Sequence, residues 1–343
     1  MKIYVDAYLA KNLGDDLFIN ILTNRYPEHK FYAISKGEKG YDTKNFKVYS
    51  NVYMFKALKK FQWEKHLANY YDTVVTIGGS MFMERGDTNR DFSLGKNKRY
   101  VLGINFGPYK TQEYYNNIHN MLSNVEDVCF RDKYSYNLFK DLPNVRQAAD
   151  IVFSMDMSNI KNTNRKRAII SIISPKDKIN KKYQKQYEEK MLELISFLIE
   201  KGYEICLMSF CKIEHDEEEI EEIYSKIPEK QRRNVEKYYY DGNVEEALNT
   251  IADSQLVVGG RFHANIIGLC LGKSILPVLY SDKTLHVLQD MQIDTPIIDI
   301  RNLESFDIKS ITDDDLTRHY DVEKQKEDAQ RHFEKLDLQL KKT

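Results

Sequence analysis

An arginine and a histidine follow a pair of glycines, Gly259 and Gly260, in the stretch GGRFHANIIGLCLGKSILPVLYSDK. Arg261 and His263 lie between SQLVVGG, which is typical of a buried strand end, and RFHANIIGLCLG, which has the apolar period of a buried helix. Both side chains would then lie in the first helical turn, where unpaired N–H groups and the helix dipole disfavour a cation. A bound phosphate or carboxylate would explain their presence. Lys283, after the next predicted strand, could reach the same position.

The same two side chains also admit a structural interpretation. Arg261 could pair with a carboxylate from another loop, and His263 could cap the helix or pack in the core. Either residue alone would favour this interpretation, because buried polar groups usually have a partner within the protein. Two glycines, an arginine, a histidine and a strand-end lysine together favour an anion-binding site.

Two more glycine-containing loops follow predicted strands. In NLGDD, Gly14 allows a tight turn after the first strand, and Asp15 or Asp16 can cap the next helix or hold a sugar hydroxyl. In IGGSMF, Gly78 and Gly79 end a strand and would let a ligand approach backbone amides closely. Each loop by itself is also compatible with an ordinary turn.

A fourth loop, FRDKYS, places Arg131 at a strand end, followed by Asp132 and Ser135. This pattern is consistent both with a ligand contact and with an ordinary N-cap beside a salt bridge. In open α/β sheets, ligands bind outside the carboxyl ends of the strands. All four loops follow such strand ends, so their residues are candidates for binding sites.

Several common catalytic motifs are absent from the sequence. It contains no G-x-G-x-x-G fingerprint, no P-loop, no G-x-S-x-G elbow and no H-E-x-x-H pair. The acidic run HDEEEIEE, residues 215–222, has the spacing of a solvated helix face rather than of a metal site. Four scattered cysteines indicate neither a zinc site nor a disulfide framework, and favour a reducing, cytoplasmic setting. We therefore expect no metal.

Charge and hydropathy exclude two classes of protein. The 343 residues carry a formal net charge of -1, whereas nucleic-acid binders usually show a basic excess. No run of about 18 apolar residues occurs, so we expect no spanning helix. The opening MKIYVDAY is typical of a first strand rather than of a signal peptide. Residues 55–71 interleave basic and aromatic side chains, which favours a plain amphipathic helix over a membrane-binding one.

Short apolar runs alternate with amphipathic segments, which indicates an α/β protein with mainly parallel sheets. The clearest expected strands are 2–8, 31–35, 72–82, 99–109, 167–173 and 203–210. A polar stretch without periodicity, 156–166, separates two such series. The sequence therefore predicts two Rossmann-like domains, 1–157 and 166–343, with a ligand cleft between them. We expect a terminal surface helix within 320–343, as part of the second domain.

The loops and their order resemble the polysaccharide pyruvyl transferase family. NLGDD resembles the family's N-x-G-D-[DE] opening, VVTIGGSMF its strand with a glycine triplet, and INFGP its G-x-x-x-G-P segment. CFRDKYSYNLF resembles its R-D-x-x-S helix start, and AADIVF its A-D-P stretch. GGRFHANIIGLCLGKSILPVLYSDK resembles its closing G-x-R-x-H block, the most specific of these motifs. Ser80 stands where the family usually has a third glycine, and Ile151 where it usually has proline.

The resemblance implies an activity and an architecture. The family transfers pyruvyl groups from phosphoenolpyruvate to sugars of bacterial surface polysaccharides as ketals, and its architecture is similar to glycosyltransferase B. It implies a cytoplasmic enzyme of exopolysaccharide, capsule or cell-wall synthesis that acts on a free or lipid-linked saccharide. A lipid-linked acceptor would imply peripheral contact with the inner membrane. Phosphoenolpyruvate is a co-substrate, so no cofactor is implied.

The resemblance also implies roles for individual residues. Arg261 and His263 would be catalytic, with Arg261 gripping the donor anion and His263 moving the proton, since histidine titrates near neutral pH. The expected donor-binding residues are Gly259, Gly260, Arg261, His263 and Lys283. The expected acceptor-binding residues, in the first domain, are Asn12, Gly14, Asp15, Gly78, Gly79, Ser80 and Arg131. Arginine and lysine could supply the electrostatic stabilisation without a metal.

Two other functions remain open. A nucleotide-sugar-dependent glycosyltransferase of the same architecture would use the basic loop to hold a diphosphate, and a uridine or guanosine diphosphate sugar would stabilise it. A non-catalytic glycan-binding protein of a polysaccharide assembly complex would bind glycan without turning over phosphoenolpyruvate. The joint presence of Arg261, His263 and Lys283 argues against the second alternative. No nucleic-acid partner and no particular oligomeric state is predicted.

Overall fold

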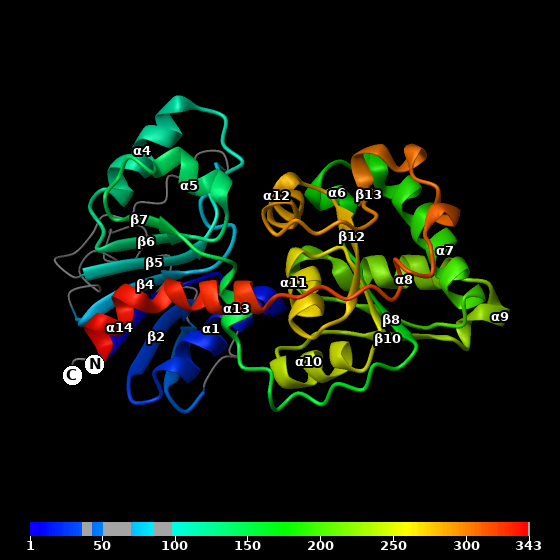
Figure 1. The fold of residues 1–343 in the computed structure, drawn as a ribbon, viewed down its shortest axis with the longest axis horizontal. Coiled ribbons are helices and arrows are strands. Elements are labelled where there is room, and N and C mark those ends of the chain that lie inside the picture. The colour runs from blue at the N-terminus through cyan, green and yellow to red at the C-terminus, as the bar shows by residue number, and fades with distance from the viewer. Residues whose placement is uncertain (36–42, 51–69, 85–97, 342–343) are drawn as a thin grey trace. The chain divides into compact units, whose positions relative to one another are not determined.

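The computed structural model describes residues 1–35, 43–50, 70–84 and 98–341 (Figure 1). The chain forms two compact units. The first comprises Met1–Leu9, Leu17–Met155 and Lys324–Thr343, and the second comprises Ala10–Asp16 and Asp156–Glu323. Each unit contains one parallel sheet packed with helices, as the alternation of apolar runs and amphipathic segments predicts.

The first unit has a parallel sheet of strand order β3-β2-β1-β4-β5-β6-β7. Its strands are β1 Lys2–Asp6, β2 Lys30–Ser35, β3 Phe46–Ser50, β4 Thr73–Ile77, β5 Lys98–Ile104, β6 Asp127–Phe130 and β7 Val145–Gln147. All five residues of β4 (TVVTI) are buried, as expected for a central parallel strand covered on both faces. The strand order reverses between β1 and β4, so the loop that begins at Gly78 leaves the sheet at its topological switch point.

Helices of the first unit cover this sheet with apolar and aromatic side chains. Within the described residues they are α1 Leu13–Arg25, whose first residues belong to the second unit, α4 Gln112–Leu122, α5 Lys133–Phe139, α13 Glu323–Ala329 and α14 Glu334–Leu340. Ile118 and Leu122 of α4 and Phe139 of α5 share one core cluster with Val101 of β5 and Val128 of β6. The helices therefore hold the loops at the carboxyl ends of β4, β5 and β6 in place.

The second unit has a parallel sheet of strand order β10-β9-β8-β11-β12-β13. Its strands are β8 Arg167–Ser171, β9 Glu204–Met208, β10 Val235–Tyr238, β11 Leu256–Gly259, β12 Ser274–Leu279 and β13 Ile298–Asp299. Its helices are α6 Pro175–Lys178, α7 Gln184–Glu200, α8 Asp216–Lys226, α9 Glu229–Arg232, α10 Val244–Ala252, α11 Phe262–Cys270 and α12 Asp282–Asp290. This order is that of a Rossmann sheet, and its switch point lies between β8 and β11.

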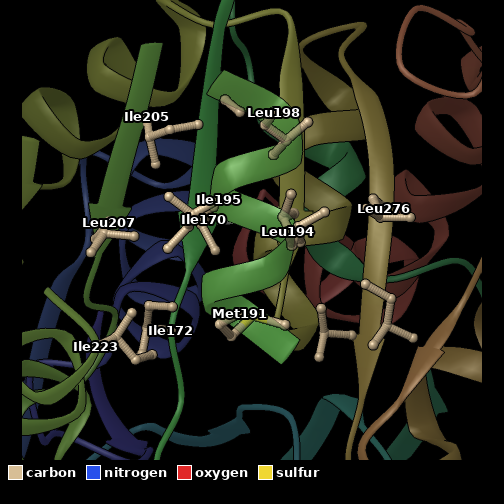
Figure 2. Packing of buried hydrophobic residues seen from close by; sticks show 14 of the residues in the cluster. Ile170, Ile172, Met191, Leu194, Ile195, Leu198, Ile205, Leu207, Ile223 and Leu276 are labelled. Atoms are coloured by element: carbon tan, nitrogen blue, oxygen red, sulfur yellow. The ribbon is translucent and has the colours of Figure 1, made fainter. Parts of the chain in front are cut away.

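Helix α7 buries one apolar face against the second sheet. Tyr187, Met191, Leu194, Ile195 and Leu198 are at most 1% exposed. Figure 2 shows four of them packed over isoleucines and leucines of β8, β9 and β12. The apolar side chains of α7 recur with period 3.6, and isoleucine and leucine are typical of a parallel sheet that is covered on both faces. The local pattern therefore indicates which face of the helix is buried.

The units differ from the predicted domain bounds in two segments. Residues 10–16 belong to the second unit, and residues 324–343 to the first. In the terminal segment, Asp337 accepts one hydrogen bond from Nη2 of Arg25 and one from the hydroxyl of Tyr26, each 2.7 Å long. The sparse apolar residues of this segment, Phe333, Leu336 and Leu340, are at most 1% exposed. Their packing against the first unit explains why the segment joins it.

His332 of this terminal segment is fully buried and should make stability depend on pH. Its Nε2 donates a hydrogen bond to the carbonyl oxygen of Ala149 over 2.7 Å. Burial lowers the pKa of His332 to about 4, although the Ala149 bond opposes that shift. The folded chain thus binds fewer protons here than the unfolded chain, so the contribution to stability is complete above the ordinary histidine pKa and is lost as pH falls towards 4. The full loss is on the order of 3 kcal/mol.

Urea unfolding at pH 7 and pH 5 tests this expectation. The free energy of unfolding of the His332→Gln variant, which keeps a donor for Ala149, should fall less between these pH values than that of the unsubstituted protein, by about 2 kcal/mol. Equal declines in both proteins would show that His332 titrates normally in the folded state.

None of the helices in the described ranges has the length and apolar character required to span a bilayer. The predicted amphipathic segment 55–71 falls almost entirely outside the described residues. The plain amphipathic helix that the sequence favours there, over a membrane-binding one, stays a prediction.

Candidate functional site

The junction between β11 and α11 lies at the switch point of the second sheet. β11 ends at Gly259, and α11 begins at Phe262. A Cβ atom at Gly260 would overlap the carbonyl oxygen of Ser171, to which the Gly260 amide donates a hydrogen bond of 3.1 Å. A Cβ at Gly259 would overlap the side-chain amide of Asn265. Both glycines are therefore explained by close packing within the unit.

Asn265 closes this junction from inside the helix. Its Nδ2 donates to the carbonyl oxygens of Gly259 over 3.0 Å and of Arg261 over 3.2 Å. The Asn265 side chain is fully buried, so these bonds are shielded from water. The first turn of α11 is thus held rigidly at the carboxyl end of β11.

The guanidinium of Arg261 is held by two carboxylates of the same unit. Nε donates to Oδ2 of Asp216 over 3.0 Å, Nη2 donates to Oδ1 of Asp216, and Nη1 donates to Glu214. Burial alone would lower the pKa of Arg261, but these carboxylates outweigh it and raise the pKa, so the side chain stays charged. The structural interpretation of Arg261 thus accounts for most of its donors.

The two carboxylates differ in how accessible they are. The Asp216 side chain is fully buried, and its Oδ2 also accepts hydrogen bonds from the amides of Phe210 over 3.0 Å and Cys211 over 2.9 Å. The Glu214 side chain is 22% exposed. An anionic ligand could therefore replace Glu214 at Nη1 but could not replace Asp216 without unfolding this loop.

His263 is the second residue of α11 and is 9% exposed. Its ring centroid lies 4.9 Å from that of Phe262 in an edge-to-face arrangement. On another side, the Nδ1, Cγ and Cε1 atoms of the ring face Gly14, where an added Cβ atom would overlap them. The imidazole is therefore packed on its Nδ1 side, and Nε2 lies on the side away from Gly14.

The segment Ala10–Asp16 belongs to the same unit as His263. Asn12 accepts a hydrogen bond from the Gly14 amide through Oδ1 over 3.1 Å, and forms an antiparallel bridge with Cys211. The predicted residues Asn12, Gly14 and Asp15 are therefore in the unit that carries the predicted donor residues, rather than in the first domain as expected. The proximity of Gly14 to His263 is a consequence of this placement.

Lys283 lies in the first turn of α12, after β12. Its Nζ is 5.5 Å from the ring centroid of Tyr280. Tyr280 also helps to raise the pKa of Arg261 electrostatically, but less than Asp216 and Glu214 do. Because β11 and β12 are parallel neighbours, their carboxyl ends bring Lys283 and Arg261 to the same edge of the sheet.

The remaining predicted residues lie in the first unit. A Cβ at Gly79 would come 2.9 Å from Nη1 of Arg131. Nη1 of Arg131 donates to Asp150 over 3.0 Å, and Nη2 donates to Oδ1 of Asn105 over 2.7 Å. Ser80 donates to the same Asn105 oxygen over 3.2 Å. Gly79, Ser80 and Arg131 thus meet in one network, with Arg131 only 4% exposed, and Gly78 leads into it from β4.

The FRDKYS segment contains the N-cap that the sequence suggests. Asp132 is the N-cap of α5, and it accepts hydrogen bonds from the amide of Ser135 over 2.7 Å and from its hydroxyl over 3.0 Å. The Ser135 hydroxyl oxygen in turn accepts a bond of 2.8 Å from the amide of Phe106. This motif therefore fixes the loops after β5 and β6 to each other.

Among the described residues, no three His, Cys, Asp or Glu side chains are grouped as a metal site. The four cysteines, Cys129, Cys206, Cys211 and Cys270, are free and buried. The charged side chains that meet at the junction between β11 and α11 are those of Arg261, Asp216 and Glu214.

Comparison with known sequences identifies the family. The sequence model of the family described as polysaccharide pyruvyl transferase matches residues 10–283. The chain belongs to this family. The match starts with the Ala10–Asp16 segment and ends at Lys283, so it spans every residue that the sequence nominates for the site. The resemblance drawn from the motifs is confirmed.

One curated relative of this polysaccharide pyruvyl transferase family member is the amylovoran biosynthesis protein AmsJ of Erwinia amylovora. The two are 24% identical over 286 residues, which is 74% of this chain and 68% of AmsJ. The family and this relative place the protein among transferases of polysaccharide biosynthesis.

Solved structures with the same architecture share little sequence with the chain. UDP-GlcNAc 2-epimerase from Methanocaldococcus jannaschii, in complex with UDP-GlcNAc and UDP, has a TM-score of 0.64 at 10% identity, over 98% of this chain and all of the epimerase chain. Anabaena Alr3699/HepE, in complex with UDP-glucose, has a TM-score of 0.56 at 11% identity, over 100% and 98% of the two chains. These similarities confirm the predicted fold class, two parallel α/β domains of glycosyltransferase B type.

Sequence reasoning missed the partner of Arg261. The run 215–222 was expected to be solvated, which is wrong for Asp216 and Glu219, at most 2% exposed. A signal was available, because Asp216, Ile220 and Ile223 have the spacing of one buried helix face. Tyr240, which donates to Asp16, has no such signal, since it follows two other tyrosines.

Proposed function

We propose that this member of the family transfers the pyruvyl group of phosphoenolpyruvate to a sugar of a surface polysaccharide or its lipid-linked precursor, forming a ketal. The observation that carries this proposal is the position of His263 in the first turn of α11, packed against Gly14 of the family's N-x-G-D motif. The first and last of the motifs quoted from this sequence thus meet at Gly14 and His263, which supports a shared site.

The donor is a trianion, so its site needs backbone N–H donors and cations. The first turn of α11 offers N–H groups and the positive end of the helix dipole. Lys283 supplies a mobile positive charge at the same sheet edge. Arg261 contacts the donor through Nη1, where the anion takes the place of the partly exposed Glu214 carboxylate, while Asp216 keeps the guanidinium oriented.

The reaction has two additions to the same carbon. His263 donates a proton from Nε2 to the methylene carbon of phosphoenolpyruvate, while the oxygen of one sugar hydroxyl bonds to the adjacent carbon and loses its proton. The C–O bond to phosphate then breaks, and phosphate leaves with the bonding electron pair. A second hydroxyl oxygen bonds to the same carbon and releases its proton, which closes the ketal. One of the two released protons restores His263 and the other leaves on phosphate.

The predicted acceptor-binding residues of each unit include short polar side chains. Asp15, in the turn beside Gly14, is half-buried and can accept a hydrogen bond from a sugar hydroxyl. Ser80, held by Asn105, offers a hydroxyl at the carboxyl end of β4. The buried Arg131 orients that loop through Asp150 and Asn105 rather than contacting the sugar.

Phosphate release tests the proposal. The purified protein, phosphoenolpyruvate and either a lipid-linked acceptor or a nitrophenyl galactoside or N-acetylmannosaminide should yield inorganic phosphate and a product heavier by a pyruvate ketal. Mass spectrometry of the product and a phosphate assay measure both. Thermal stabilisation by a uridine or guanosine diphosphate sugar, with none by phosphoenolpyruvate, would instead indicate a nucleotide-sugar glycosyltransferase. Glycan binding without phosphate release from any acceptor would indicate a binding protein.

A further inference from the structure

The Ala10–Asp16 segment is attached to the rest of its unit at both ends. At one end, the Leu13 amide donates to the carbonyl oxygen of Phe210 over 3.0 Å, next to the bridge between Asn12 and Cys211. At the other end, the hydroxyl of Tyr240 donates to Oδ2 of Asp16 over 2.6 Å. Tyr240 and Asp16 are each 2% exposed, so this bond is shielded from water.

The attachment leads back to Arg261. Asp216, the bidentate partner of Arg261, accepts hydrogen bonds from the backbone amides of Phe210 and Cys211. These are the same two residues that bind Leu13 and Asn12 of the segment. The Tyr240 amide donates to the hydroxyl oxygen of Ser209 over 3.0 Å, which ties Tyr240 to the same loop. One loop, residues 209–216, therefore connects Arg261 to both ends of the Ala10–Asp16 segment.

Between these two ends, the segment contacts the imidazole of His263. Gly14 lies so close to Nδ1, Cγ and Cε1 that no larger residue fits without displacing the ring. The Gly14 amide donates its hydrogen bond to Oδ1 of Asn12, so Gly14 contacts the imidazole by packing alone. The Nε2 atom of His263 lies on the other side of the ring. A shift of either end would therefore move the surface on which the ring rests.

We infer that Gly14, Asp16 and Tyr240 are positioning residues for His263, which hold its Nε2 atom where the proton is transferred. The inference rests on the proposed role of His263 in proton transfer. Reaction rates depend steeply on such placement, because a misplacement of about 1 Å can cost on the order of 100-fold in rate. The conformation of this segment thus decides whether the histidine is competent, although none of the three residues needs to touch the substrate.

Two tyrosines of this chain make a matched test. Tyr240→Phe removes the hydrogen bond to Asp16, and Tyr26→Phe removes a bond of 2.7 Å to Asp337 from an equally buried tyrosine of the first unit. Both variants should lose about 1–3 kcal/mol of unfolding free energy. Only Tyr240→Phe should lower kcat for phosphate release, by about 10-fold, with KM for phosphoenolpyruvate within about twofold.

Gly14→Ala should have a larger effect, on the order of 100-fold in kcat, together with a displaced pH profile. The Asp16→Asn variant keeps an oxygen that can accept the hydrogen bond from the Tyr240 hydroxyl. This variant should therefore retain more activity than Asp16→Ala. Equal kcat values for Tyr240→Phe and Tyr26→Phe would overturn the inference, whether or not Gly14→Ala folds.

NMR of the histidine side chains separates this inference from the proposed function. With isotope-labelled histidine, the His263 signal is identified by its loss in His263→Gln. It should shift, and its titration should change, in Tyr240→Phe but not in Tyr26→Phe. This result supports the positioning role even if phosphoenolpyruvate is not turned over by any acceptor tried. An unchanged His263 signal and titration in Tyr240→Phe would contradict it.

Discussion

Replacing His263 by glutamine should reduce phosphate release from phosphoenolpyruvate by about 10²- to 10⁴-fold, the usual contribution of a general acid. Glutamine can occupy the same space in the first turn of α11 and donate a hydrogen bond, but it cannot deliver a proton to carbon. KM for phosphoenolpyruvate should change much less than kcat. Steady-state phosphate assays on the variant and the unsubstituted protein measure both.

His319→Gln is a suitable control for this substitution. His319 lies in the same unit, and its Nδ1 bonds the carbonyl oxygen of Gly272 at the C-terminal end of α11, far along the helix from His263. The activity of the His319→Gln variant should stay within about twofold of that of the unsubstituted protein, since surface substitutions rarely have large effects. Full activity of His263→Gln would remove His263 from the chemistry and leave it as a packing residue.

Replacing Arg261 by methionine should lower the free energy of unfolding by about 3–5 kcal/mol, because Asp216 would remain buried without its cation. Activity should be lost together with this stability. The double variant Arg261→Met with Asp216→Asn removes the unpaired charge while an amide oxygen still accepts the Phe210 and Cys211 amides. It should therefore recover at least about half of the lost stability. Urea unfolding followed by circular dichroism measures these differences.

Arg301→Met provides the matched control for this pair. Arg301 is also bidentate with an aspartate, Asp299, but its side chain is 36% exposed, whereas that of Arg261 is 7% exposed. Exposed pairs contribute about 0–1 kcal/mol, so this variant should be nearly as stable as the unsubstituted protein. If the Arg261→Met variant were as stable as the unsubstituted protein yet inactive, Arg261 would act mainly by binding the donor. Its ion pairs with Glu214 and Asp216 would then contribute little to the stability of loop 209–216.

Much of the fold could be predicted because its signals are local. The apolar period of α7, the β-branched strand TVVTI and the glycines at strand ends each lie within a few neighbouring residues. Local pattern also locates the strand-end loops, since parallel strands place their carboxyl ends on one edge. The family followed from the order of those loops, and its sequence match covers all of them.

The partners of the site residues could not be predicted in the same way. Arg261 pairs with Asp216, 45 positions away, and Tyr240 reaches Asp16 across 224 positions. Which carboxylate meets a buried arginine depends on how loops pack, and a residue pattern along the chain does not encode that. The terminal segment 324–343 joins the first unit for the same reason, through Asp337 and a few apolar contacts.

The residues at the joint between β11 and α11 show where this division falls. From sequence, two glycines, Arg261 and His263 indicate an anion site at a strand end, and that indication needs only local periodicity and the dipole of a helix. Tertiary packing alone decides that Asp216 and Glu214 accept hydrogen bonds from the Arg261 guanidinium. It also decides that Ser171 and Asn265 lie where a side chain on Gly260 or Gly259 would be, and that Gly14 lies against the imidazole of His263. Burial strengthens the contacts of Asp216, Ser171 and Asn265, and burial is a property of the folded chain as a whole.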